Sequence, residues 1–351
     1  MKKERFIFAD VIRTIAIIFV IMIHTTSSYM YDVVLGTDVL SFNLVLILNS
    51  IFSIAVALFF MISGCFLIRK DSDLDRNQFK RVVKRIVQLL FWTICYLLFC
   101  KYVLDWNIDL NYSLKAMFFN VQVSHLWFMY PLIALYLLSP IVSKLYYSIS
   151  KKQLNYLLII TFVIPLIVKT FSQFFSFISM PLFAVGFSEF GYFILGKYIF
   201  DNRKILKEKL KLITPIVLTI IGIILILIYA KYNIYRFGIA DKPFYDYSRF
   251  PVALYCVSFY TIFVFLEDRL KNMPNFLKKI ITSIGQNSGG IYFLHMLILY
   301  IIGNLYIGSI GFTSNEGNIL FMILGAFLYF IVSYLVILIL KKIPIIKYFV
   351  E

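Results

Sequence analysis

"RTIAIIFVIMIH", residues 13–24, has an arginine at one end, a histidine at the other, and a single threonine as the only polar residue between them. Eleven helical steps of about 1.5 Å and about 100° each would place Arg13 and His24 roughly 16 Å apart on nearly the same face. The stretch therefore predicts an apolar helix that carries a permanent cation and a titratable ring in line. Such a helix needs an explanation, because ionisable groups are rare in apolar surroundings.

The composition of the chain indicates which environment surrounds this helix. The 351 residues are 61% hydrophobic, 19% aromatic and only 15% charged, with a mean hydropathy of +0.87. A soluble domain of this size needs more charge on its surface, and long apolar runs are typical of polytopic membrane proteins. The runs lack the alternation of a transmembrane barrel, so we predict an all-α membrane protein.

The hydrophobic runs predict about ten transmembrane helices, most of them within the usual length of about 17–25 residues. We expect residues 1–351 to form a single integral membrane domain with no separate soluble domain. The opening MKKER resembles the start of a secretory signal, but Asp10 and Arg13 interrupt its apolar region, so the first helix should be retained. The predicted spans are residues 7–28, 44–68, 86–104, 126–147, 154–171, 179–199, 212–230, 250–266, 287–307 and 319–340.

The distribution of positive charge predicts the orientation of these helices. The formal net charge is +16, and 26 of the 34 Lys and Arg residues belong to the alternate segments that start with the N-terminus. Cytoplasmic loops of membrane proteins carry this excess, so both termini are predicted to be cytoplasmic. The basic residues are then explained by topology and by contact with anionic lipid, and a nucleic-acid partner is not expected.

Ionisable residues inside the predicted spans are functional candidates, because each costs several kcal/mol unless it faces a cavity or a partner. Counting along the helices places Arg13 about 10 Å from the cytoplasmic edge and His24 about 27 Å from it, near the outer face. His125 is expected near the outer face as well. Glu189 and His295 are expected in the inner half, at depths comparable to that of Arg13.

Each candidate also has a purely structural interpretation, which the sequence leaves open. Arg13 could extend to the inner headgroups as a topology anchor. Glu189 and His295 could be hydrogen-bond partners between helices. His24 could be an interfacial histidine hydrogen-bonded to a loop, and His125 beside Trp127 fits an ordinary interfacial belt.

Several stretches, in order along the chain, resemble the membrane acyltransferases of the acyltransferase-3 type, which O-acylate bacterial surface glycans. In the first of them Arg13 and His24 have the family's Arg-x10-His spacing, and the second contains the Ser63-Gly64 pair. The last resembles a late helix that carries a histidine, here His295. The matching stretches are FADVIRTIAIIFVIMIH (8–24), LFFMISGCFLI (58–68), HLWFMYPLIALYLLSPIV (125–142), GYFILGKYIF (191–200) and SGGIYFLHMLIL (288–299).

The resemblance implies transfer of an acyl group, most simply acetyl from cytoplasmic acetyl-CoA, to a hydroxyl of a cell-surface or lipid-linked saccharide. His24 would act as the base or as the acyl carrier, since neutral imidazole suits either role near pH 7. Arg13 would contact the donor or the developing oxyanion. The expected location is the bacterial cytoplasmic membrane. No metal is expected, and a succinyl or other acyl donor is a further alternative.

The basic run KRVVKRI (80–86) departs from the family pattern, which has an Arg-x-x-Arg cluster before the third helix. Arg85 matches one arginine, Val82 occupies the place of the other, and Arg81 and Lys84 are candidate substitutes. We expect these three basic residues to bind the phosphates of the acyl-CoA donor. Many family members also carry an extracellular hydrolase-like domain, which this sequence does not contain.

The acceptor saccharide is expected at the outer side of the predicted passage. His125, Trp127, Glu189 and His295 are the candidate contacts inside the bundle. The longest outer loop, KYNIYRFGIADKPFYDYSRF (231–250), interleaves aromatic with charged residues that suit sugar rings, and we add two of its tyrosines as candidates. A loop folded onto an interfacial aromatic belt is the open alternative. The two tyrosines are Tyr235 and Tyr245.

A function of another class uses the same polar interior. A transporter or flippase of lipid-linked sugars would move its substrate without covalent change. The sequence has neither repeated halves nor paired broken helices, which disfavours it. Besides lipid, donor and acceptor, two partners stay open: a separate extracellular protein that completes the transfer, and a second copy of the chain.

Overall fold

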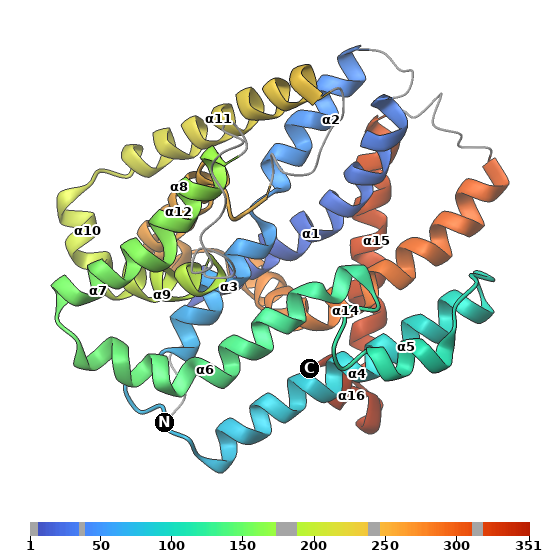
Figure 1. Ribbon diagram of the computed structural model, residues 1–351, viewed down its shortest axis with the longest axis horizontal. Coiled ribbons are helices and arrows are strands. Elements are labelled where there is room, and N and C mark those ends of the chain that lie inside the picture. Colours follow the sequence, from blue (N-terminus) through green and yellow to red (C-terminus); the bar gives the residue numbers. More distant parts are fainter. Residues whose placement is uncertain (1–5, 35–38, 173–187, 238–245, 311–318) are drawn as a thin grey trace.

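The computed structural model describes residues 6–34, 39–172, 188–237, 246–310 and 319–351, and in these ranges the chain is helical without any strand. Figure 1 shows the helices gathered into one bundle, with α1 in its interior against α2, α3, α14 and α15. The helices are α1 (Ile7–Val34), α2 (Val39–Phe52), α3 (Ala55–Leu67), α4 (Arg76–Tyr102), α5 (Leu110–Ala116), η1 (Ser124–Phe128), α6 (Met129–Ser148), α7 (Lys151–Leu158), η2 (Ile159–Val163), α8 (Ile164–Phe171), α9 (Ser188–Asp201), α10 (Arg203–Lys209), α11 (Ile213–Phe237), α12 (Phe250–Phe265), α13 (Glu267–Lys271), α14 (Asn275–Ile310), α15 (Ile319–Leu340) and α16 (Pro344–Val350).

Seven helical segments of the described residues are long and apolar enough to cross a membrane. The predicted all-helical membrane architecture is therefore confirmed, whereas the count of ten and the cytoplasmic side of both termini stay predictions. The other three predicted spans overlap α9, α12 and α14, of which α12 is a shorter apolar helix. The seven segments are Ile7–Thr26, Phe42–Leu67, Arg76–Tyr102, Ser124–Ser148, Lys151–Phe171, Ile213–Arg236 and Met322–Leu340.

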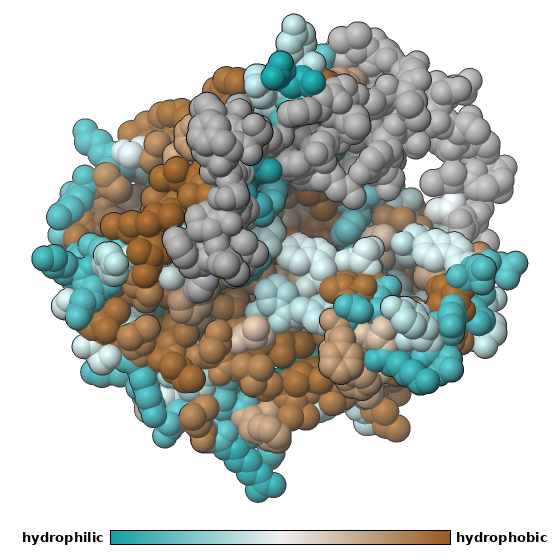
Figure 2. Space-filling model, viewed as in Figure 1, coloured by the Kyte–Doolittle hydropathy of each residue, from teal (hydrophilic) through white to brown (hydrophobic). Residues whose placement is uncertain are grey.

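The outer faces of the helices are as apolar as the interior. Figure 2 shows hydrophobic side chains spread over the face of the molecule that α6 forms, with hydrophilic side chains mainly toward the edges of the view. On α6 the exposed residues include Leu137 and Ile141, and α11 and α15 expose isoleucines and leucines in the same way. Lipid chains can solvate such surfaces where water cannot, so these faces fit a bilayer.

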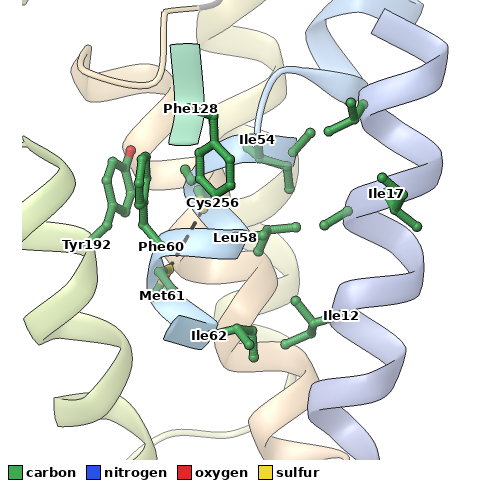
Figure 3. Close-up of a cluster of buried hydrophobic side chains, with 14 of the residues drawn as sticks. Ile12, Ile17, Ile54, Leu58, Phe60, Met61, Ile62, Phe128, Tyr192 and Cys256 are labelled. Carbon is green, nitrogen blue, oxygen red and sulfur yellow. Dashed lines mark hydrogen bonds between the residues drawn. The ribbon is translucent and has the colours of Figure 1, made fainter. Parts of the chain in front are cut away.

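The core is built around α1, α3 and α9. Ile12 and Ile17 of α1 face Leu58 and Ile62 of α3 in a buried cluster (Figure 3). Behind it α3 and α9 touch through glycine: a Cβ at Gly64 would lie 1.7 Å from the carbonyl oxygen of Phe193 on α9. Small residues allow such close approach of membrane helices, where packing rather than the hydrophobic effect holds helices together.

The second predicted span is broken between α2 and α3. Side chains of this span and of α12 satisfy backbone groups near the break. Ser53 Oγ donates to the Ser50 carbonyl at 2.8 Å, and the hydroxyl of Tyr255 on α12 donates to the Ile51 carbonyl at 2.9 Å. Asn49, one turn earlier, accepts from Thr26 Oγ1 at 2.9 Å. Broken helices are tolerated in membranes where neighbours re-satisfy the freed groups, and this break is joined to α1 two residues beyond His24.

Candidate active site

All three histidines of the chain converge at one point of the bundle. His24 comes from α1, His125 from η1 and His295 from α14. The ring centroids of His24 and His295 lie 5.2 Å apart, and those of His125 and His295 lie 5.6 Å apart. His295 is therefore the middle member of a histidine cluster, which we define by these three residues.

The position of His295 corrects the predicted depth. His295 does not lie at the level of Arg13 but beside His24. Helix α14 already begins at Asn275, and Thr14 of α1 donates to the Ile281 carbonyl at 3.3 Å, so His295 is fourteen residues beyond that level. The apolar run starting at residue 287 missed the first turns of α14 because they contain polar residues such as Lys278, Lys279 and Thr282.

Tyr292 contacts both His125 and His295 of the cluster. Nδ1 of His295 lies 2.6 Å from the Tyr292 carbonyl oxygen, one turn earlier on α14. The Tyr292 hydroxyl donates to the His125 carbonyl at 2.5 Å. The Nε2 atoms of His125 and His295 are buried and have no hydrogen-bond partner among the described residues. Buried polar atoms are nearly always paired, so two such atoms side by side mark a candidate functional site.

Tyr96 of α4 connects the histidine cluster to the backbone of α14. Its hydroxyl donates to the Phe293 carbonyl at 2.7 Å and accepts from the Leu297 N–H at 3.1 Å. These two groups are four residues apart, so Tyr96 bridges a donor and an acceptor that an ordinary helix pairs directly. The Tyr96 ring also packs edge-on against His125, with centroids 4.4 Å apart.

A cavity of about 290 Å³ runs along α14 toward the histidine cluster. Its lining on α14 extends from Gly285 to Phe293, about 12 Å of helix at about 1.5 Å per residue. The cavity is lined by Arg13, Arg85 and Tyr292, among others. The Tyr292 hydroxyl bonds the His125 carbonyl, and the Tyr292 ring centroid lies 5.9 Å from that of His295. His24 is not among the lining residues and faces His295 instead.

Arg13 combines a structural partner with access to the cavity. Its Nη1 lies 3.4 Å from Asp10 Oδ1, and its guanidinium lies over the Phe66 ring at 5.1 Å. The Arg13 side chain keeps 29% of its surface exposed while that of Asp10 keeps 3%. The ion pair thus orients Arg13 without removing it from the cavity.

The three residues of α4 predicted to bind the donor phosphates are placed differently. Arg85 lines the cavity, and its Nη1 donates to Gln88 Oε1 at 2.7 Å. Arg81 donates to Gln78 Oε1 at 2.8 Å, and Lys84 lies over the Tyr348 ring at 5.3 Å, but neither residue lines the cavity.

Trp127 and Glu189 meet at a second polar group, built around Tyr247. The rings of Trp127 and Tyr247 are stacked, with centroids 5.8 Å apart and planes 9° apart. The Tyr247 hydroxyl donates to Glu189 Oε1 at 2.5 Å, and Tyr192 donates to the Tyr247 carbonyl at 2.6 Å. Burial and the Glu189 carboxylate both raise the pKa of Tyr247, so this hydroxyl keeps its proton.

Of the two tyrosines predicted in the loop 231–250, only Tyr235 has a described position, and it does not join this group. Tyr235, on the last turns of α11, is 87% exposed. Tyr245 lies outside the residues that the structure describes. Asp246 follows it directly and forms an ion pair with Lys169 of α8 at 2.8 Å.

Sequence reasoning missed four residues of the site. Tyr292 could have been found, because it stands one turn before His295 on the same face of its helix. Tyr247 belongs to the aromatic loop 231–250 but was not one of the two tyrosines chosen from it, and Tyr96 carried no signal, since 25 tyrosines are spread through the chain. Gly289 lines the cavity, and its role depends on the space beside it.

No group of three or more His, Cys, Asp or Glu side chains that could hold a metal ion occurs among the residues with a described structure. The imidazole rings of the histidine cluster can take part in proton transfer and hydrogen bonding.

The chain was also compared with known proteins. The family model described as an acyltransferase domain, of the acyltransferase-3 type, matches residues 6–339. The match includes Arg13, Arg85 and the whole histidine cluster. No curated protein and no solved structure matches the chain.

Proposed function

Because the chain belongs to the acyltransferase-3 family, we propose that this membrane acyltransferase moves an acetyl group from cytoplasmic acetyl-CoA to a hydroxyl of a cell-surface or lipid-linked saccharide. We place it in the bacterial cytoplasmic membrane, with the basic loops inside. The family match and the apolar helices support a multi-pass membrane acyltransferase, and the donor, the acceptor and the residue roles are our proposal.

One observation supports the proposal most strongly: the cavity that Arg13 and Arg85 line reaches Tyr292, which contacts two members of the histidine cluster. Two guanidinium groups suit the anionic parts of an acyl-CoA, since arginine binds phosphate through paired charge-assisted hydrogen bonds. The histidine cluster supplies proton acceptors at the other end of the same path.

The size of the cavity indicates how a donor would fit. Ligand pockets measure about 300–1,000 Å³, and this one is at the lower limit. It suits the acyl end and the narrow arm of a coenzyme A, while the nucleotide would stay near the basic start of α4. Arg81 and Lys84, which lie outside the cavity, are placed for that outer contact.

His24 has the central chemical role in this proposal. As a base, it takes the proton of the acceptor hydroxyl while that oxygen bonds to the acyl carbon. The bond from carbon to sulfur breaks, and the thiolate that leaves is protonated to free coenzyme A. Arg13 would neutralise negative charge on the donor. As an acyl carrier, His24 would hold the group between two such transfers.

The acceptor would approach from the side of Trp127 and Tyr247. Stacked aromatic rings present a flat apolar surface of the kind that packs on a sugar ring, and the Glu189 carboxylate can accept hydrogen bonds from hydroxyls. Glu189 Oε2 is buried and has no partner among the described residues, which leaves this oxygen for such a contact.

Mass spectrometry of surface glycans tests the proposal. Three cell lines are compared, which produce the wild-type chain, His24→Ala, or Thr25→Ala. Thr25 is the matched control, because its hydroxyl only returns to the carbonyls of its own helix. We expect an added acetyl mass with the wild type and with Thr25→Ala, and its loss with His24→Ala.

Other outcomes would change the proposal in distinct ways. An added succinyl mass would replace the donor, and undiminished acetylation by His24→Ala would remove His24 from the chemistry. Glycan that reaches the surface only with the chain, yet without added mass, would favour the transporter or flippase.

A further inference from the structure

We propose that a second cavity, at the edge of the bundle beside α10 (Figure 1), binds the headgroup of an anionic phospholipid. The cavity measures about 450 Å³ and shares no lining residue with the cavity that Arg13 lines. Its walls come from the end of α10 with the linker to α11, and from the junction of α12 and α13. The inference goes beyond acyl transfer and does not depend on it.

The lining of this cavity carries an excess of positive charge. Of its nine residues four are basic, and one, Glu208, is acidic. The basic residues are Lys207, Lys209, Lys211 and Arg269. The last three form no ion pair with an acidic side chain anywhere in the described ranges. Like charges gathered around one cavity repel one another, and a bound anion relieves that repulsion.

Ion pairs between α10 and α13 hold the walls of the cavity in place. Arg203 Nε lies 3.1 Å from Glu267 Oε2, and the Glu267 side chain keeps only 4% of its surface exposed. Lys207 Nζ lies 2.8 Å from Asp268 Oδ2, one residue farther along α13. Lys207 is thus used within the scaffold, and the other three basic residues of the lining are left for a ligand.

The apolar part of the lining indicates a lipid rather than a soluble anion. Leu212 directly precedes the segment of α11 that is long and apolar enough to cross a membrane, and Phe265 is the last residue of the apolar helix α12. Because α11 packs along α12, the cavity lies where the apolar lengths of both helices stop. In a bilayer this is the level of the lipid headgroups, where basic pockets between helices bind anionic lipid.

An exposed apolar face of α11 offers a path for the acyl chains of the same lipid. Ile213, Val217, Ile220 and Ile224 are 57%, 45%, 52% and 48% exposed. Their spacing of three or four residues puts them on one side of the helix, and this face begins one residue after Leu212. A ligand with an anionic head and apolar chains therefore matches both the cavity and the surface next to it.

Binding is tested on the purified full chain in neutral detergent, by native mass spectrometry and by thermal unfolding. The probes are phosphatidylglycerol, phosphatidylcholine with the same acyl chains, and inorganic phosphate. We expect phosphatidylglycerol to stay bound and to raise the unfolding temperature, and the other two probes to do neither at the same concentration. Equal retention of phosphatidylcholine would overturn the role of the charge, and an equal temperature rise with inorganic phosphate would assign the cavity to a soluble anion.

A triple variant tests the three basic residues. Lys209→Gln, Lys211→Gln and Arg269→Gln together should weaken phosphatidylglycerol binding about 100-fold, since each Lys or Arg near an anionic lipid surface contributes about fivefold. The three side chains are exposed, so the unfolding temperature without lipid should equal that of the wild type. Arg269→Gln alone should weaken binding about fivefold, which keeps the comparison open at the level of one residue.

The matched control removes the same charge outside the cavity. Lys151→Gln, Lys152→Gln and Lys204→Gln change three exposed lysines, and Lys204 belongs to α10 itself without lining the cavity. We expect this variant to bind phosphatidylglycerol within about twofold of the wild type. An equal loss of binding in the two triple variants, or unchanged binding in the cavity variant, would overturn the inference.

Discussion

Two glycines show opposite uses of a missing side chain. A Cβ built on Gly289 meets no atom within 4 Å, because the residue faces the cavity that Arg13 lines. At Gly64 the same atom would enter the carbonyl group of Phe193. One glycine leaves space for a ligand, and the other lets two helices touch.

Replacing Gly289 with leucine should fill the cavity without disturbing the fold. We expect donor KM to rise at least tenfold, while stability stays level or increases, since glycine inside a helix is destabilising by about 0.5–1 kcal/mol. Gly64→Ala is the matched control and should lower the unfolding temperature. Normal donor kinetics in Gly289→Leu would show that the donor does not use this cavity.

The basic residues of α4 give a second pair of matched variants. Arg85→Gln should raise KM for acetyl-CoA by about tenfold or more, because a charge-assisted contact in the cavity contributes about 1.5–3 kcal/mol. Lys84→Gln removes the same charge one residue away, outside the cavity, and should have a smaller effect. An equal rise in KM in the two variants would show that both residues act only by general electrostatic attraction of the anionic donor.

At the scale of single residues the sequence was a partial guide to the site. Arg13 and His24 could be predicted, because their spacing puts ionisable groups on one face of an apolar helix. The position of His125 beside them could not be predicted. His24 and His125 are 101 residues apart on the chain, and they come together only because η1 packs against α14. The Tyr96 hydroxyl bonds the backbone of α14, about 200 residues away on the chain, and no local sequence pattern predicts such a contact.

Among the elements, the start of α12 is attached to the end of α8 by three polar contacts. Asp246 pairs with Lys169 at 2.8 Å, Arg249 donates to the Lys169 carbonyl at 2.9 Å, and the Phe250 N–H donates to Thr170 at 2.8 Å. These contacts hold the segment that carries Tyr247, and hence the platform it forms with Trp127.

The ion pair predicts a stability change with pH. Burial alone would raise the pKa of Asp246, but the charge and hydrogen bond of Lys169 and the hydrogen bonds from Ser248 together outweigh burial and hold the pKa below its usual value. Its stabilisation is therefore full above the unfolded pKa of about 3.9 and is lost as the pH falls through the folded value. We expect Asp246→Asn to lower the unfolding temperature at pH 7, and this difference to disappear as the pH falls through the lowered folded pKa of Asp246. A difference that persists in acid would assign the loss to packing.

Helix boundaries show where reading apolar runs works and where it fails. The long helices α1, α6, α11 and α15 follow directly from their hydrophobic runs, whereas α4 begins at Arg76, ten residues before its predicted span at 86–104, because its first turns are polar and basic. The break between α2 and α3 has no proline or glycine at its centre, and only tertiary hydrogen bonds such as that from Tyr255 reveal it. Helix α14 starts at Asn275, earlier than its apolar run, because its first turns contain polar residues that apolarity alone does not assign to a helix.

For the whole molecule, the orientation in the membrane is the prediction that most affects the direction of transfer. Cysteines introduced at Leu74 and at Tyr235, which are 71% and 87% exposed, provide probes on opposite predicted sides. A membrane-impermeant thiol reagent added to intact cells should label Tyr235→Cys and spare Leu74→Cys. The reverse pattern would place the basic loops outside and separate the cavity from cytoplasmic acetyl-CoA.

The backbone contact between α3 and α9 has a mechanical consequence. The Phe193 carbonyl of α9 packs directly against the α-carbon of Gly64 on α3. Because this contact leaves no space for one helix to slide or rotate against the other, we expect α3 and α9 to move as one rigid unit. Any motion that admits a sugar or releases coenzyme A must then come from elsewhere. We expect this motion in α14, because the Tyr96 hydroxyl already bonds the backbone of α14 at Phe293 and Leu297. Helix α14 can bend there while α3 and α9 keep their positions.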